Sequence, residues 1–136
     1  MEQVRDVMTK NPTSCDPSST TVEAAKIMAS EDVGSVPVAK DGRLLGIVTD
    51  RDLVVRVLAE GRDPTSTTIG EIASSDVETV SPDDDLNTAL RKMAGNKVRR
   101  LPVVEGDELV GIVAQADVAR QGDDSETGQV VEEISK

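Results

Sequence analysis

The chain has 136 residues, the length of one compact domain or of two small halves that share a core. Hydrophobic residues make up 37% and charged residues 30%, which is enough apolar material for a core and excludes wholesale disorder. The net charge of −11 repels phosphate backbones. Phe, Trp and Tyr are absent, so bases cannot be held by aromatic stacking, and we expect no nucleic-acid binding.

The residues of the common catalytic and metal sites are also missing. Histidine is absent and Cys15 is the single cysteine, so an intrachain disulfide, a zinc site and a Ser-His-Asp triad all lack their parts. We therefore predict no catalytic residues, no metal and no enzyme activity. No apolar run approaches the roughly 20 residues of a membrane-spanning helix, and the N-terminus has no apolar signal segment. We expect a cytoplasmic protein without membrane insertion.

Aspartate dominates the acidic residues, with 15 Asp and 11 Glu against 6 Lys and 9 Arg. Such a surface suits the high-salt cytoplasm of a halophile, where self-repulsion is screened. An ordinary solvated acidic surface fits the same counts, so composition leaves both interpretations open.

Internal repetition organises the chain. Shifted by 65 positions, residues 4–53 align without a gap over residues 69–118, and 12 of the 50 pairs are identical. Pro-Val and Gly-Ile-Val recur at this one offset, which chance does not explain. The chain is therefore a tandem duplication. The pairs that anchor the motifs are Pro37/Pro102, Val38/Val103, Gly46/Gly111, Ile47/Ile112 and Val48/Val113.

The first repeat begins with a short turn that has Val4 and Val7 on one face, followed by an extended piece over residues 13–15. A helix follows, capped by Thr20 or Thr21 and running to about Ser30. Its predicted buried face is Val22, Ala25 and Met28. Strands over 35–39 and 44–48 are joined by an Asp41-Gly42 turn. The last helix spans 50–59, and its predicted apolar stripe is Leu53, Val54, Val57 and Leu58.

The second repeat follows the same plan. It has an extended piece over 78–80, a helix from about Asp84 to Ala94, strands over 100–105 and 108–113, and a helix that starts near Gln115. Asp83, Asp84 and Asp85 resemble a metal cluster, but acidic residues gather at helix N-termini, and we interpret them as a solvated cap. Each half therefore has the order β-α-β-β-α.

The fold class that follows is α/β, with two repeats packed sheet to sheet about a pseudo-two-fold axis. About 55 residues bury too little surface for a firm core alone, so the halves are expected to need each other. The predicted domains are repeat one over 1–61, a linker over 62–68, repeat two over 69–120, and an acidic mobile tail over 121–136.

The repeat resembles a CBS (cystathionine β-synthase) domain, and the tandem resembles a CBS pair, or Bateman module. The resemblance covers residues 4–120 and rests on the order and duplication of several motifs. These are Val7-Met8-Thr9, Pro37-Val38 and Gly46-Ile47-Val48-Thr49-Asp50-Arg51-Asp52-Leu53, then Arg100-Leu101-Pro102-Val103-Val104 and Gly111-Ile112-Val113-Ala114-Gln115-Ala116-Asp117-Val118.

The resemblance implies a regulatory module that binds an adenine nucleotide (AMP, ADP or ATP) in a cleft between the repeats. We expect no enzyme or transporter to be attached to this sequence, so the implied effector is a separate protein. We expect a homodimer and no required cofactor. Two other interpretations stay open: an interaction module with empty clefts, and a sensor for S-adenosylmethionine or NAD.

In the family pattern Thr-x-x-Asp, the carboxylate binds the ribose hydroxyls and the threonine approaches phosphate or ribose. Thr49 and Asp52 match both positions, and a carboxylate can accept hydrogen bonds from two hydroxyls. In the competing interpretation these residues only cap the helix that begins there. In repeat two Asp117 remains but Ala114 replaces the threonine, so we expect two unequal sites or one site.

The resemblance also places Arg99 and Arg100 at the phosphate of the ligand held by Thr49 and Asp52, since guanidinium groups match phosphate geometry. Weak surface pairing with carboxylates is the alternative. Repeat one has no arginine there, and its Ser35-Val36, at the positions of Arg100 and Leu101, are expected ligand-binding residues. Members of the family bind adenine at the first strand of each repeat, which here corresponds to Ser14-Cys15 and Thr79-Val80. The remaining expected ligand-binding residues are Pro37 and Leu101. We expect Cys15 to be a buried small hydrophobe rather than a catalytic thiol.

Overall fold

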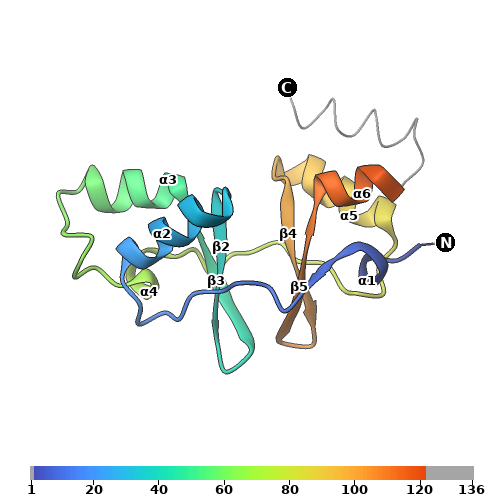
Figure 1. Ribbon diagram of the computed structural model, residues 1–136, viewed down its shortest axis with the longest axis horizontal. Coiled ribbons are helices and arrows are strands. Elements are labelled where there is room, and N and C mark those ends of the chain that lie inside the picture. The colour runs from blue at the N-terminus through green and yellow to red at the C-terminus, as the bar shows by residue number, and fades with distance from the viewer. Residues whose placement is uncertain (1, 122–136) are drawn as a thin grey trace. The chain divides into compact units, whose positions relative to one another are not determined.

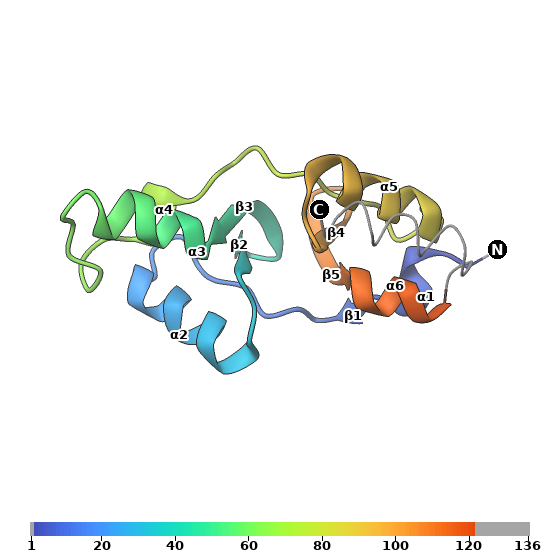
Figure 2. The ribbon, with the colours of Figure 1, turned by 90° about the horizontal axis from the view of Figure 1, so that it is seen from above.

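The computed structural model describes residues 2–121, with side chains described through Ala119. The chain divides into two compact units, one formed by Thr13–Val77 and the other by Met1–Pro12 together with the chain from Glu78 onward. Figures 1 and 2 show the helices and hairpin of each unit. The mixed α/β class is confirmed. Apart from Gln121, the predicted acidic tail lies outside the described residues.

The unit formed by Thr13–Val77 is built on a hairpin with helices beside it (Figure 1). It contains α2 (Thr21–Glu31), β2 (Ser35–Lys40), β3 (Arg43–Thr49), α3 (Asp50–Asp52), the π-helix η1 (Leu53–Leu58) and α4 (Ile69–Ile72).

The other unit repeats this plan and begins with the N-terminal segment. It contains α1 (Val4–Val7), β1 (Thr9–Lys10), α5 (Leu86–Asn96), β4 (Arg100–Glu105), β5 (Glu108–Ala114) and α6 (Gln115–Gln121). β1 and β4 both pair antiparallel with β5.

The compact units exchange their first segments relative to the sequence repeats. α1 and α4 are equivalent at the 65-residue offset, yet α1 belongs to the unit of repeat two and α4 to the unit of repeat one. Val4 and Ile69 at their starts are fully buried in these cores. The predicted boundaries at 1–61 and 69–120 follow the repeats in the sequence. The compact units of the structure divide the chain differently, because each contains the first segment of the other repeat.

Both hairpins have the same register and the same irregularity. Ser35 lies opposite Thr49 and Arg100 opposite Ala114, and each pairing shifts by one residue near its turn. Asp41 and Gly42 have φ of 52° and 82°, so the predicted two-residue turn forms with both residues in the left-handed region.

The glycine of each Gly-Ile-Val motif is required because another segment of main chain passes close to its Cα. The segment after α4 pairs with β3, where the amide of Ser74 donates to the Ile47 carbonyl at 2.9 Å, and a Cβ at Gly46 would collide with the Ser74 carbonyl. In the other unit a Cβ at Gly111 would lie 2.9 Å from the Thr9 carbonyl oxygen. The motif repeats because the same crossing occurs twice.

The helix caps agree with the sequence. Thr20 caps α2, since its side chain accepts from the Glu23 amide at 3.4 Å. Asp85 caps α5 by accepting from the Thr88 amide at 2.8 Å, and this hydrogen bond holds the pKa of Asp85 below its usual value. The cap interpretation of the aspartate run is thereby confirmed for Asp85.

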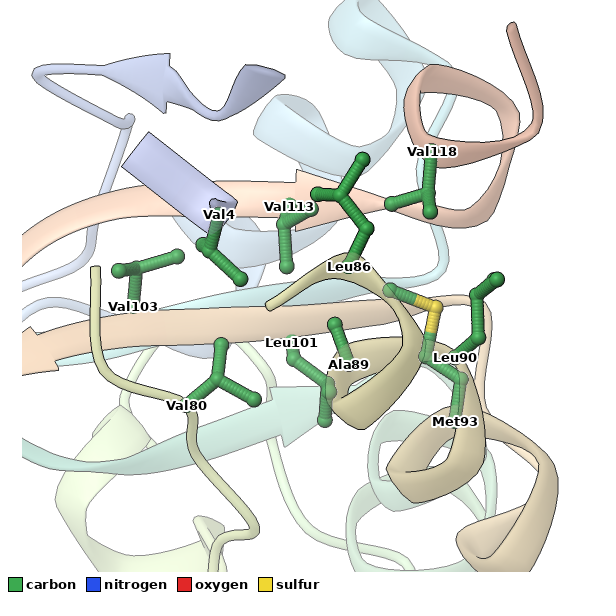
Figure 3. Packing of buried hydrophobic residues seen from close by; sticks show 10 residues of the cluster. All are labelled: Val4, Val80, Leu86, Ala89, Leu90, Met93, Leu101, Val103, Val113 and Val118. Atoms are coloured by element: carbon green, nitrogen blue, oxygen red, sulfur yellow. The ribbon is translucent and has the colours of Figure 1, made fainter. Parts of the chain in front are cut away.

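Each unit has its own aliphatic core. Figure 3 shows the core of the unit that contains α5, where side chains from helices and strands meet. It consists of Val4, Val80, Leu86, Ala89, Leu90, Met93, Leu101, Val103, Val113 and Val118. The core of the other unit consists of Cys15, Ala24, Met28, Val36, Val38, Val48, Val57, Ile69 and Ile72.

Two predicted helix faces are wrong in part, although Met28 and Val57 are buried as predicted. After β3 the Ala59 amide donates to the Val54 carbonyl, five residues back, so this stretch is a π-helix whose faces are rotated from those of an α-helix. Val57 is buried, but Val54 is 54% exposed and Leu58 63% exposed. In α2 the buried residues are Thr21, Ala24 and Met28, and the predicted Ala25 is exposed.

Candidate functional site

The predicted ribose-binding residues lie in the unit formed by Thr13–Val77, where β2 begins and β3 ends. Ser35 is the register partner of Thr49 across the hairpin. The amide of Asp50 donates to the Gly34 carbonyl at 2.9 Å, which holds the start of α3 against the start of β2. The hairpin thus places a serine and a threonine hydroxyl at one end of the sheet, next to a helix N-terminus.

Thr49 and Asp52 form a reciprocal cap at this helix start. The Thr49 side chain accepts from the Asp52 amide at 3.1 Å, and the Thr49 amide donates to Asp52 Oδ2 at 2.8 Å. Asp52 Oδ1 lies 3.8 Å from Nε of Arg56, and the Asp52 side chain is 15% exposed. The capping role weighed against ligand binding is therefore present. It fixes the carboxylate and leaves one oxygen outside the cap.

Cys15 lies beside the same strand. Its amide donates to the Pro37 carbonyl, and its carbonyl accepts from the Ala39 amide, both at 2.9 Å. The Cys15 side chain is buried, and burial raises the pKa of its thiol, with the Glu23 charge adding to the effect. A thiol with a raised pKa is a poor nucleophile at neutral pH, which agrees with the interpretation of Cys15 as a small hydrophobe.

The unit therefore brings together the predicted residues of repeat one, but not all of their side chains are accessible. Ser14 is exposed, and Ser35 and Thr49 are half-buried. Val36 belongs to the hydrophobic core and Pro37 is buried, so both can meet a ligand through main-chain atoms only.

The other unit holds the repeat-two residues in an equivalent arrangement. Val80 pairs with β4, since its amide donates to the Pro102 carbonyl at 3.1 Å and its carbonyl accepts from the Val104 amide at 2.8 Å. The Thr79 carbonyl, one residue earlier, accepts from Nζ of Lys92 at 2.8 Å. Leu101 is a core residue, 1% exposed.

Arg99 and Arg100 lie at the start of β4. Arg100 is the register partner of Ala114, and the Gln115 amide donates to the Arg99 carbonyl at 2.8 Å, so both arginines neighbour the first turn of α6, which contains Asp117. Arg99 is exposed and Arg100 half-buried. The arginines and the Thr49–Asp52 cap belong to different units, and their meeting at one phosphate stays a prediction.

Sequence reasoning missed Lys92. The 65-residue offset places Lys92 over Ile27, so one helix position carries a cation in repeat two and an aliphatic side chain in repeat one. That difference is visible in the sequence, but its meaning depends on the contact with Thr79. Arg56, which lies against Asp52, also donates from Nη1 to the Ile72 carbonyl at 3.1 Å and was not predicted.

A surface hollow of about 430 Å³ lies beside Arg56, the neighbour of Asp52. Its lining is Arg56, Glu60, Arg62, Glu71 and Ile72. None of the predicted site residues is in it. Within residues 2–121, no group of three or more acidic, cysteine or histidine side chains could hold a metal ion. The helices of this described part include none long and apolar enough to cross a membrane.

The comparison with known proteins shows the same duplication. The family model of the CBS domain matches the chain twice, over residues 4–59 and 69–123. The chain belongs to the CBS domain family. The CBS domain-containing protein YhcV of Bacillus subtilis is 38% identical over 136 residues, covering 99% of this chain and 96% of its own length.

Three crystal structures of CBS proteins are similar in fold. Hypoxic Response Protein I with two coordinated zinc ions is 38% identical, covers 90% of this chain and 100% of its own, and has a TM-score of 0.80. CBSX2 in complex with AMP is 26% identical, with 89% and 96% coverage and a TM-score of 0.77. The CBS pair of protein MJ0100, in complex with 5′-methylthioadenosine and S-adenosyl-L-methionine, is 29% identical, with 89% and 95% coverage and a TM-score of 0.75.

Proposed function

We propose that this CBS pair is a regulatory module that binds an adenine nucleotide, AMP, ADP or ATP, and signals to a separate protein. The observation that carries the proposal is the convergence of Ser35, Thr49 and Asp52 at the end of one hairpin. The main chain of Cys15 pairs with strand β2 of the same hairpin. The AMP complex of CBSX2 and the adenosyl complexes of MJ0100 support an adenosine-containing ligand.

The chemistry of these groups suits a ribose 5′-phosphate. A carboxylate that is already oriented by the Thr49 amide accepts hydrogen bonds from ribose hydroxyls without a further ordering cost. Arg99 and Arg100 supply the cations that a phosphate requires in a chain with a net charge of −11. These cations favour a nucleotide over S-adenosylmethionine, because S-adenosylmethionine carries no phosphate.

The proposal includes how the module works. Ligand binding changes the balance between two arrangements of the chain or of its subunits, which requires different affinities for the two arrangements. We place the protein in the cytoplasm, as a homodimer, and assign it regulation rather than catalysis. The exposed apolar side chains of η1, Val54, Val55 and Leu58, support self-association, since water-exposed apolar clusters favour a partner.

An ultraviolet spectrum of the purified protein tests the proposal directly. The chain has no Trp, Tyr or Phe, so it absorbs almost nothing at 260–280 nm. We expect an absorption band near 260 nm that is released by heat and whose mass identifies an adenine nucleotide.

A flat spectrum calls for a second measurement, in which ATP, ADP, AMP and S-adenosylmethionine are titrated against the melting temperature. A shift with a nucleotide supports the proposal. A shift with S-adenosylmethionine alone replaces the nucleotide with that ligand, and no shift with any of them supports an interaction module without a ligand.

A further inference from the structure

Lys92 distinguishes the two repeats at the Thr79-Val80 segment, where the family resemblance places the base. It lies on α5, and its ammonium group donates to the Thr79 carbonyl at 2.8 Å and lies 3.6 Å from Oε1 of Glu78. The Lys92 side chain is 36% exposed. The ammonium therefore lies at residues 78–80, which we call the edge segment because Val80 pairs with β4. It is partly open to solvent.

The equivalent position of repeat one has the opposite chemistry. Residue 27 is isoleucine, and its half-buried side chain packs against the core of its unit. An isoleucine side chain has no hydrogen-bond donor, so the Ser14 carbonyl cannot have the partner that the Thr79 carbonyl has. In repeat one, the Ser14 carbonyl therefore has no lysine beside it. In repeat two, the Thr79 carbonyl already accepts a hydrogen bond from the Lys92 ammonium.

This difference matters for a purine. The 6-amino group of adenine is a donor, and it pairs with a free main-chain carbonyl. Beside Thr79 that donor would have to share the carbonyl with Lys92, next to a positive charge. An ammonium has three donor hydrogens, so with one on Thr79 and the Glu78 carboxylate 3.6 Å away, a hydrogen remains for an acceptor on the ligand.

Building on the proposed function, we propose that Lys92 sets the base preference at the Thr79-Val80 segment: it disfavours a purine with a 6-amino edge and favours one with a 6-oxo edge. Adenine belongs to the first class and hypoxanthine to the second. The two repeats of one chain thus select different purine nucleotides, and the duplicated module compares two ligands instead of binding one ligand twice.

The test uses nitrogen-15-labelled full-length protein titrated with AMP and, separately, with IMP. The amide signals of Thr79 and Val80 report on the Lys92 segment, and those of Ser14 and Cys15 report on the equivalent segment of repeat one. We expect Thr79 and Val80 to respond at lower IMP than AMP concentration. Lys92→Met should reverse that order, with a change of about tenfold in the ratio of the two affinities, as expected for one charge-assisted hydrogen bond.

Two control variants separate specificity from structure. Lys92→Arg keeps the charge and should keep the preference for IMP. Lys26→Met removes an exposed lysine from α2, in the other unit, and should change nothing at Thr79. If Lys92 only ties α5 to the edge segment, Lys92→Met lowers the melting temperature and leaves the AMP-to-IMP ratio unchanged, which would overturn the inference.

The remaining outcomes are also decisive. If AMP moves the signals of Ser14 and Cys15 while neither nucleotide moves those of Thr79 and Val80, the inference is wrong and the proposed function stands. If neither nucleotide nor ATP moves any signal of the wild-type protein, the proposed function fails and this inference fails with it.

Discussion

At the scale of single residues, Asp52 combines a helix cap with the proposed contact to a ligand. Its Oδ2 accepts from the Thr49 amide, and its Oδ1 lies near Arg56, so the carboxylate is held in place before any ligand arrives. Asp117 occupies the equivalent position of α6, but Ala114 in place of threonine leaves that helix without the hydroxyl of the cap. The two carboxylates are therefore expected to bind ribose with different strength.

Replacement of Asp52 tests that asymmetry. Asp52→Ala should weaken nucleotide binding about 10- to 100-fold, since hydrogen bonds to a charged acceptor contribute about 1.5–3 kcal/mol. Asp117→Ala should weaken it less. Calorimetry measures both affinities. Asp52→Asn is the control, because an amide oxygen still accepts from the Thr49 amide but carries no charge. Equal affinities of the two alanine variants would contradict the idea of unequal sites.

The paired arginines are tested by the number of phosphates on the ligand. Arg99→Ala combined with Arg100→Ala should weaken ATP and AMP about tenfold or more and leave adenosine nearly unchanged, because guanidinium groups bind phosphate and not the base. Titrations of the three ligands give the comparison. Equal losses for all three would mean that neither arginine contacts phosphate.

At the scale of the elements, the crossing of backbone over each hairpin leads to a stability prediction. Gly46→Ala should lower the free energy of unfolding by about 1–3 kcal/mol, since the new Cβ meets the Ser74 carbonyl. Gly95→Ala is the matched control: Gly95 lies in α5 with open space around it, and alanine there should add about 0.5–1 kcal/mol. Urea unfolding of both variants measures this. Two equal effects would show that the close approach is unimportant.

The exposed side chains of η1 lead to a prediction about self-association. Val54→Lys combined with Leu58→Lys should convert the proposed dimer to a monomer, because two charges on each chain would be buried in the proposed interface. Light scattering coupled to size-exclusion chromatography gives the mass. Glu31→Lys, an exposed change at the end of α2, is the control and should leave the mass unchanged. A dimeric double variant would remove η1 from the interface.

Most elements could be predicted because the duplication reports each of them twice. The Asp41-Gly42 turn, the Thr20 cap and the strands β2 and β4 follow from local chemistry. The faces of the helix after β3 could not be predicted, since a π-helix breaks the spacing that an α-helical stripe assumes. The cap formed by Thr49 and Asp52 could be predicted from the motif, and their role in ligand binding stays a prediction. The contact of Lys92 could not be predicted, because it joins the lysine to a main-chain carbonyl 13 residues away.

At the scale of the whole molecule, the acidic composition predicts a response to salt. Repulsion among surface charges opposes folding and is screened within about 3 Å at 1 M salt. The melting temperature should therefore rise by several degrees between 0.05 and 2 M KCl. Calorimetric scans measure this rise.

A variant with reduced charge is the control for that experiment. Replacing the exposed Glu2, Asp76 and Glu105 by lysine brings the net charge to −5, because each exchange adds two positive charges. Its melting temperature should depend less steeply on KCl. If the melting temperature of the wild-type protein does not rise with salt, the halophile interpretation is contradicted, and the surface is an ordinary solvated acidic one.

The exchange of first segments between the units has a consequence for synthesis on the ribosome. α1 leaves the exit tunnel before the other described helices, but Val4 is buried in a core whose other buried members begin at Val80. The unit of residues 13–77 becomes complete while the rest of the chain is still being made. α1 therefore stays without its packing partners until α5 and the second hairpin emerge, and we expect it to fold after the unit of residues 13–77 although it is translated before that unit.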